Sequence, residues 1–444
     1  MTHPRMKLVA AAVIAAACAG AQALPMAAAD EPGGTTSRGV KIPAFYTPPA
    51  ELPAANGALV RTEPLPLGLT LPSTDGPLPG KATRLMYKST DAGGKPVGVT
   101  GAYIEPTAKW KGDGPRPVVA VAPGTMGQGD QCSASLGLEH PITFNGKTMS
   151  VGYEDLAVYR FLAEGAAVVV TDYPGLGGTD RLHTYVNRVD EGHAVLDAVR
   201  AARTVDGASV GADSPVGLYG YSQGGGAVAS AAELQPEYAP DVELSGTYSG
   251  APPANLEEVI KGIDGSALAG ALGWSINGFA QNDPALQPIV DANVNDKGKA
   301  ALKDLSTMCI GDALFGYGFK KSKDWTKSGK TLSEIVAGEP KLQATMDAQR
   351  LGKIKPSGPV RLATGVEDDI VPHEQARQLA ADWCAKGGAV TYEPVKLPNL
   401  GDKIVTNHVA PLLTDQGKAV SWLTDRLAGK PAGPGNCGEV PRLP

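Results

Sequence analysis

Apolar residues fall into short unbroken runs along this chain, separated by longer amphipathic stretches. Three runs, 117–122 (PVVAVA), 166–171 (AAVVVT) and 216–219 (VGLY), contain no charged residue. Such runs are typical of strands buried on both faces of a parallel sheet. Residues 193–203 (HAVLDAVRAAR) instead place apolar positions at the spacing of a helix packed on a sheet. The pattern predicts an α/β fold, with a mostly parallel sheet flanked by helices.

Further segments complete this sheet on both sides. The alternating runs 84–88 and 96–104 predict an antiparallel meander at one edge. Residues 225–234 predict a helix of small residues, and 242–248 predict the strand that follows it. After 250 the pattern becomes irregular and mainly helical until about 345, so a helical cap is expected there.

Sheet architecture returns after the cap. The predicted elements are a strand at 359–364 (PVRLAT), a helix at 374–386, a strand at 389–397 and a final helix at 409–427. The Pro- and Gly-rich tail predicts no regular structure. The expected divisions are an export signal at 1–29, an extended arm at 30–60, the first part of the core at 61–250, the cap at 251–345, the second part of the core at 346–430 and a tail at 431–444.

The first residues have the pattern of an export signal. Arg5 and Lys7 precede an apolar run at 8–19, which is too short to span a bilayer. Two A-x-A cleavage sites follow, at 21–23 and 27–29, and the second is preferred because acidic and glycine-rich residues come next. No later stretch reaches the roughly 20 apolar residues of a membrane helix. The sequence therefore predicts a secreted chain without a transmembrane anchor.

Cysteine and charge counts refine this prediction. Cys18 raises a lipoprotein alternative, although Ala15 is a poor lipobox residue. Removal of the signal leaves an even number of scattered cysteines, which favours two disulfides with three connectivities open and disfavours a metal site. The four are Cys132, Cys309, Cys384 and Cys437. The net charge is −6, so a nucleic-acid partner is not expected, and the lysine-rich stretch 320–330 is interpreted as a solvated face.

Residues 220–224 (GYSQG) match the G-x-S-x-G pattern of a nucleophilic serine. With 56 glycines in the chain, the match alone is weak. Its position strengthens it, because it lies between an apolar strand pattern and a small-residue helix pattern, as such a serine requires. We expect Ser222 to be the nucleophile, and the alternative is an idle serine in a glycine-rich turn.

A serine hydroxyl needs a base to take its proton. Where the nucleophilic serine lies in a strand–turn–helix motif, the acid and then the histidine come after it in the sequence. Only His373 and His408 lie after Ser222. No later strand end offers an acid to His373, whereas His408 lies in a polar loop before the final helix. We therefore expect His408 to be the base and the other histidines to be structural or exposed.

The orienting acid is expected in 365–372 (GVEDDIVP), at the end of a predicted strand. Asp368 lies just past this strand and can turn back toward His408, where a carboxylate fixes the tautomer and stabilises the imidazolium. Glu367 and Asp369 remain alternatives, and either one could instead belong to a solvated acidic turn.

An acyl-transfer reaction also needs two N–H donors for the oxyanion. Gln223 is expected to supply one, because it follows the serine at a helix N-terminus. The loop 123–130 after PVVAVA is expected to supply the other, with Thr125 preferred over Gly124 and Met126. The patterns H-E-x-x-H and G-x-x-x-x-G-K-[ST] and a dinucleotide fingerprint are absent from the sequence, so we expect no metal and no cofactor.

These motifs resemble, in order, those of the secretory lipase family, typified by the fungal lipase A enzymes and their exported bacterial relatives. The matching segments are 45–49 (FYTPP), 122–125 (APGT), 172–177 (DYPGLG), 220–225 (GYSQGG), 365–372 (GVEDDIVP) and 407–409 (NHV). The resemblance implies an α/β-hydrolase core with a helical cap inserted before the acid-bearing strand. It also implies Cys132–Cys309 and Cys384–Cys437 bridges.

For function, the resemblance implies hydrolysis of triacylglycerols and simpler esters by Ser222, Asp368 and His408. One departure is Thr125, because the fungal members have an acidic residue there. An apolar stretch of the cap is expected to line an acyl pocket, contact a lipid interface, or simply form the cap core. It contains Leu268, Leu272, Trp274, Ile276 and Phe279. The alternatives are an acyltransferase or peptidase with the same triad, and a non-catalytic binding protein on the same scaffold.

Overall fold

The computed structural model describes residues 34–74 and 76–442. The export signal expected at 1–29 and the first residues of the arm lie outside the described residues. Within the described ranges, no helix has both the length and the apolar character that crossing a bilayer requires.

Nine strands form the central sheet, in the order β13-β12-β11-β10-β6-β9-β5-β4-β3. They are β3 (Leu59–Leu65), β4 (Gly80–Thr90), β5 (Pro96–Pro106), β6 (Val118–Ala122), β9 (Ala167–Thr171), β10 (Val216–Tyr221), β11 (Leu244–Gly250), β12 (Val360–Gly365) and β13 (Val390–Val395). Neighbouring strands run parallel from β13 to β9, whereas β9, β5, β4 and β3 pair antiparallel. The predicted α/β fold, with a mostly parallel sheet and an antiparallel edge, is confirmed.

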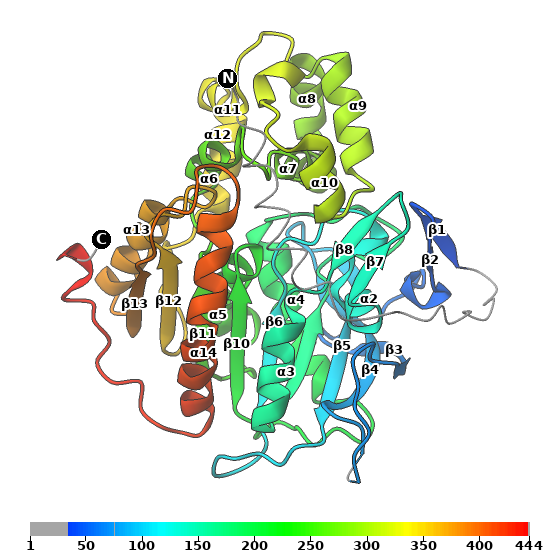
Figure 1. Ribbon diagram of the computed structural model, residues 1–444, viewed down its shortest axis with the longest axis vertical. Helices are drawn as coiled ribbons and strands as arrows, with labels where there is room; N and C mark the ends of the chain where they lie inside the picture. Colours follow the sequence, from blue (N-terminus) through cyan, green and yellow to red (C-terminus); the bar gives the residue numbers. More distant parts are fainter. Residues whose placement is uncertain (1–33, 75, 443–444) are drawn as a thin grey trace.

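Helices cover both faces of this sheet (Figure 1). On one face lie α4 (Arg188–Ala202), α5 (Gln223–Tyr238) and α13 (His373–Ala385), and on the other lie α3 (Asp155–Glu164) and α14 (Thr406–Leu427). Every residue of β6, β9 and β10 is buried, which explains their unbroken apolar runs.

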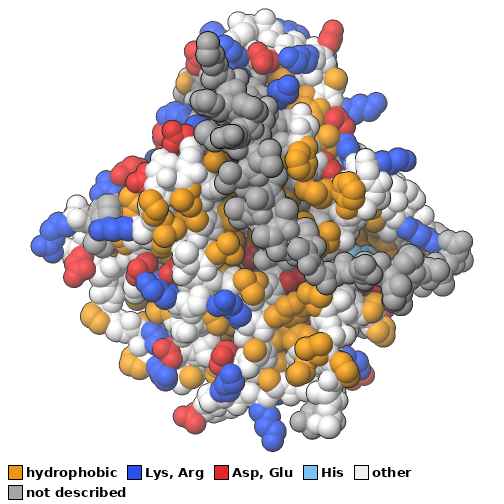
Figure 2. Space-filling model, in the orientation of Figure 1, with side chains coloured by type: hydrophobic (Ala, Val, Ile, Leu, Met, Phe, Trp, Pro, Cys, Tyr) orange, Lys and Arg blue, Asp and Glu red, His pale blue; other side chains and the backbone are white. Residues whose placement is uncertain are grey.

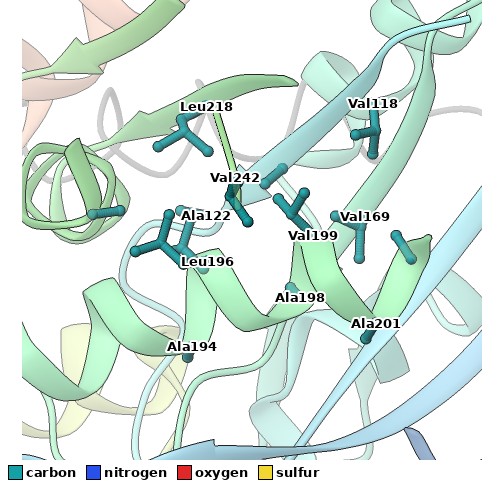
Figure 3. Close-up of a cluster of buried hydrophobic side chains, with 14 of the residues drawn as sticks. Val118, Ala122, Val169, Ala194, Leu196, Ala198, Val199, Ala201, Leu218 and Val242 are labelled. Atoms are coloured by element: carbon teal, nitrogen blue, oxygen red, sulfur yellow. The ribbon is translucent and has the colours of Figure 1, made fainter. Parts of the chain in front are cut away.

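The core between the sheet and α4 is built from aliphatic side chains (Figure 3). Val118, Val169 and Leu218 from the strands meet Leu196 and Val199 from α4. Each such side chain contributes about 1.5–3 kcal/mol when fully buried. The helix α4 begins at Arg188, five residues earlier than the apolar pattern predicted, because the Asn187 side chain accepts from the first-turn amides of Val189 and Asp190.

Seven helices lie between β11 and β12, where the cap was expected, above the carboxyl ends of the strands (Figure 1). They are α6 (Leu256–Ile263), α7 (Ala271–Asn282), α8 (Gln287–Asn293), α9 (Asp296–Leu305), α10 (Ile310–Tyr317), α11 (Leu332–Gly338) and α12 (Pro340–Gln349). The sequence placed the end of this segment near 345, but α12 continues to Gln349.

Smaller elements surround the core. The arm, expected to be extended, contains the hairpin β1 (Thr35–Ser37) and β2 (Val40–Ile42) and the short helix η1 (Ala44–Tyr46), and it is anchored by buried Phe45 and Tyr46. A second hairpin joins β7 (Ile142–Phe144) and β8 (Met149–Val151) after α2 (Ala134–Glu139). The single-turn helices are η2 (Asp130–Cys132), η3 (Pro284–Leu286), η4 (Ser322–Trp325) and η5 (Val440–Arg442).

Two disulfides fasten the periphery to the core. The structure pairs Cys132 with Cys309 and Cys384 with Cys437, as the resemblance implied. The first bridge links the core to the start of α10 in the cap. The second bridge holds the tail against α13. The prediction of no regular structure in the tail was wrong in one detail, because the short helix η5 forms beyond Cys437.

Candidate active site

The predicted site residues converge at one edge of the sheet. The residue Ser222 follows β10, the loop with Thr125 follows β6, and the turn with Asp368 follows β12. Because the carboxyl ends of parallel strands meet at the same edge, three segments that are distant in sequence become neighbours. The helix α14 brings His408 to the same edge.

The chain turns sharply at Ser222. Its φ of 57° and ψ of −123° are rare for a residue with a side chain, and such a conformation costs about 1–3 kcal/mol. Two glycines make the turn feasible. A Cβ at Gly220 would lie 2.2 Å from the Gly224 oxygen, and a Cβ at Gly224 would lie 2.0 Å from the Ala122 oxygen. The surrounding backbone therefore holds the serine hydroxyl above the sheet.

Ser222, His408 and Asp368 form one chain of hydrogen bonds. The Ser222 hydroxyl donates to His408 Nε2 at 2.9 Å, and His408 Nδ1 donates to Asp368 Oδ2 at 2.6 Å. Only the Nδ1–H tautomer satisfies both contacts. A carboxylate can only accept, so Nδ1 must carry the proton, and the unprotonated Nε2 then accepts from the serine hydroxyl. The second oxygen of Asp368 accepts from the Ile370 and Val371 amides, which fixes the carboxylate.

The two alternative acids point elsewhere. The side chain of Glu367 is exposed. The side chain of Asp369 accepts from the Lys403 amide and so joins the acidic turn to the loop that precedes His408. Of the three adjacent carboxylates, Asp368 is the one that contacts the imidazole.

His408 lies in the first turn of α14, because this helix begins at Thr406 and not near Val409 as the sequence suggested. Val405, at φ 76°, redirects the backbone immediately before the helix. The other histidine after the serine, His373, is buried against β13, where its Nδ1 lies 3.1 Å from the Gly365 oxygen and its Nε2 lies 2.9 Å from the Tyr392 hydroxyl.

Thr125 and Gln223 lie beside Ser222 on the wall of one cavity. The loop that carries Thr125 is held from below, because the Tyr153 hydroxyl donates to the Thr125 oxygen at 3.0 Å. The Gly124 amide donates to Glu154 Oε1 at 2.9 Å, so this amide is not directed at an oxyanion. The geometry thus favours Thr125 over Gly124.

The side chain of Gln223 is held by residues that the sequence did not indicate. Its Nε2 contacts His183 Nε2 at 2.8 Å and donates to Glu191 Oε1 at 2.7 Å. His183 is fully buried and stacks on Tyr173. Since His183 and Glu191 precede the serine in irregular or helical segments, no motif distinguishes them from ordinary core-facing positions.

Burial suppresses the charges near the two candidate oxyanion donors. It raises the pKa of Glu154 to about 7 and that of Glu191 to about 8, and it lowers the pKa of His183 to about 4. Near neutral pH His183 is therefore uncharged, and the carboxyl groups are at least partly protonated. No cluster of three or more His, Cys, Asp or Glu suited to a metal ion occurs in the described part of the chain.

An apolar cavity extends from Ser222 into the cap, with about 1340 Å3 of empty space including its open mouth. Leu268, Leu272, Ile276 and Phe279 line it. Trp274 does not, because it is fully buried in the cap core, where its indole N–H donates to the Leu305 oxygen at 2.9 Å. Four of the five cap residues singled out from the sequence thus face the cavity.

Known proteins resemble this chain in sequence or in fold. A protein from Mycobacterium tuberculosis named "Probable inactive lipase" is 29% identical over 391 residues, which cover 87% of this chain and 82% of that protein. A secreted triacylglycerol lipase of Malassezia globosa is 28% identical over 283 residues, which cover 63% of this chain and 59% of that lipase.

The fold is also that of a solved structure. Candida antarctica lipase A, in its closed state, superposes with a TM-score of 0.72 at 19% identity, covering 87% of this chain and 86% of that one. At this identity the likeness shows the fold, which is the α/β-hydrolase fold. A family profile described as "Secretory lipase" matches residues 138–435, about two thirds of the sequence. The chain belongs to the secretory lipase family.

Proposed function

We propose that this chain is an exported serine hydrolase of carboxylic esters, with Ser222, His408 and Asp368 as its catalytic triad. The observation that carries the proposal is the continuous chain of hydrogen bonds from the serine hydroxyl through the imidazole to a buried carboxylate. This is the arrangement in which a base can take the serine proton while the acid stabilises the resulting imidazolium.

The proposed reaction proceeds in two halves. The Ser222 oxygen attacks the ester carbonyl while its proton passes to His408 Nε2, and the Gln223 and Thr125 amides donate to the developing oxyanion. When the tetrahedral intermediate collapses, His408 returns this proton to the leaving alkoxide, so an alcohol departs and an acyl-enzyme remains. Water then attacks with His408 again as base, which releases the carboxylic acid and restores the serine.

The cavity supports an ester with an apolar acyl chain as substrate. It begins at the nucleophile and continues between apolar side chains of the cap, so an acyl group bound there would lie in a water-poor environment. The name of the Malassezia relative points to triacylglycerols, and we propose acylglycerols as the substrate class. Export, by the signal proposed at 1–29, would place the protein outside the cell.

One observation supports a second candidate function, that of a binding protein. The Mycobacterium tuberculosis relative bears the name of an inactive lipase, so a binding protein on this scaffold is the rival. An acyltransferase or peptidase with the same triad is a further rival. The hydrogen-bonded triad and the strained Ser222 conformation favour a hydrolase, because a binding protein has no need of a costly backbone conformation at this serine.

Labelling with a fluorophosphonate probe, followed by assays on p-nitrophenyl esters, triglycerides and peptide amides, tests the proposal. We expect the wild-type protein to be labelled and to hydrolyse esters, Ser222→Ala to lose both properties, and Ser328→Ala, at an exposed cap serine, to retain them. Folded wild-type protein without labelling would favour the binding protein. Labelling with amide cleavage only would favour a peptidase, and labelling with acyl transfer only would favour an acyltransferase.

A further inference from the structure

The helix α10 of the cap rests on the hairpin β7–β8 of the core. The Asp312 side chain accepts from the Thr148 hydroxyl at 2.7 Å and from the Met149 amide at 2.6 Å. At Gly311 the two elements touch, since a Cβ there would lie 2.6 Å from the Met149 oxygen. Helix and hairpin therefore form one fixed surface.

Large apolar side chains project from this surface. Phe144 is the cross-strand partner of Met149, so both point to the hairpin face that meets α10. Phe315 follows Gly311 by one helical turn and lies on the same side of α10. Phe144 is 75% exposed and Phe315 is 78% exposed.

Two more residues extend this group. Ile142, two positions before Phe144 on the same strand face, is 47% exposed, and Phe319, just after α10, is 56% exposed. We call Ile142, Phe144, Phe315 and Phe319 the Phe patch. It contains three of the six phenylalanines of the chain. Figure 2 shows hydrophobic side chains gathered over α10, with Lys and Arg side chains close by.

Unpaired lysines flank the Phe patch. Lys147 lies in the turn of the hairpin, and Lys320, Lys321 and Lys323 follow Phe319 directly. All four are exposed, and within the described ranges none forms an ion pair with a carboxylate. From the sequence alone, the stretch 320–330 is interpreted as a solvated face, but the exposed phenylalanine next to Lys320 makes that interpretation incomplete.

We propose that the Phe patch and its lysines form a docking surface for lipid aggregates that expose anionic headgroups. Phenylalanine side chains enter the boundary between headgroups and acyl chains, and lysines nearby are attracted to a negative lipid surface. A second copy of the chain fits less well, because it would bring its own lysines against these. None of the patch residues lines the cavity at Ser222, so docking is separate from the proposed chemistry.

Vesicle co-sedimentation of the full exported chain tests this proposal. We expect binding to vesicles of phosphatidylcholine with phosphatidylserine, much weaker binding to phosphatidylcholine alone, and loss of binding at high salt. Replacing Lys320→Gln with Lys321→Gln should weaken binding by roughly 25-fold, about fivefold per lysine. The pair Phe315→Ser with Phe319→Ser should abolish sedimentation.

A matched control is Leu413→Ser, which alters an exposed apolar residue on α14, and it should bind like wild type. Unchanged hydrolysis of a soluble p-nitrophenyl ester shows that each variant is folded. If the wild type lacks this activity, far-UV circular dichroism shows the folding instead. The docking test therefore stands even if the proposed hydrolase activity is absent. Sedimentation of the double-Phe variant at the wild-type level, or equal binding to both vesicle types, overturns the proposal. So does a salt-independent dimer that the Phe substitutions dissociate.

Discussion

Replacement of Glu154 by Gln should make the protein more stable than the wild type at alkaline pH. Glu154 is 4% exposed beneath the loop that carries Thr125. Its Oε1 accepts from the Gly124 amide, and its Oε2 has no partner among the described residues. Burial raises its pKa from 4.5 to about 7. The titratable groups that interact electrostatically with Glu154 carry no positive charge. They are Asp155, Tyr153, Tyr173, Tyr219 and Tyr221.

The size of the effect follows from the pKa. Between pH 4.5 and 7 the unfolded chain has released this proton while the folded chain retains it, so stability falls as the pH rises. A rise of the pKa from 4.5 to about 7 corresponds to roughly 3 kcal/mol, because each pH unit is worth about 1.36 kcal/mol. The amide of Gln keeps the acceptor for Gly124 but carries no charge at any pH. The free energy of unfolding of Glu154→Gln should therefore rise relative to that of wild type by up to about 3 kcal/mol from pH 4 to pH 8.

Urea unfolding, followed by tryptophan fluorescence at several pH values, measures this difference. Glu164→Gln is the matched control, because Glu164 lies at the other end of α3 and is partly exposed. Its free energy of unfolding should track that of wild type. If the gap between Glu154→Gln and wild type stays constant across this pH range, the carboxyl group does not retain its proton on folding and the reasoning fails.

Three further changes follow from the site and the fold. Asp368→Asn should lower kcat by about 10^3–10^4 with little change in KM, whereas Glu367→Gln should change kcat less than about twofold, as steady-state ester hydrolysis would show. Phe279→Ala should shift the preferred acyl chain toward longer esters in a chain-length profile, because the ring lines the cavity, and it should also cost about 3–5 kcal/mol of stability. Replacing both Cys384 and Cys437 by Ser should cost about 4 kcal/mol in chemical denaturation, since the bridge closes a separation of 53 residues.

The sheet and the triad could be predicted because each leaves a local signature. Strands such as β6 and β9 are buried on both faces, so nearly every position must be apolar. The turn at Ser222 needs glycines at fixed positions, and the order of acid and base after the serine limited the choice to a few residues. The start of α14 was misplaced because Val405, with its left-handed conformation, gives no sequence signal for a helix N-terminus.

The cap was harder to read, because its apolar residues serve two purposes. Trp274 packs in the cap core and Leu272 lines the cavity, yet both lie on α7 in the same apolar stretch. A cavity wall and a core require the same residue types, so composition cannot separate them. Glu154 was missed for a related reason: an acidic residue before a helix predicts a solvated N-terminus, and only the tertiary structure places it beneath a loop.

The connection between cap and core decides which variants can separate docking from catalysis. The Ile310 amide, at the start of α10, donates to the Met126 oxygen at 2.7 Å, and Met126 follows Thr125 directly. The Cys132–Cys309 bridge fastens the same junction. A change at Cys309 therefore disturbs both the docking helix and the loop of a proposed oxyanion donor, so a loss of activity on lipid would have two explanations. Changes at Phe315, Phe319, Lys320 and Lys321 act on the exposed side of this junction, so they leave the oxyanion loop intact.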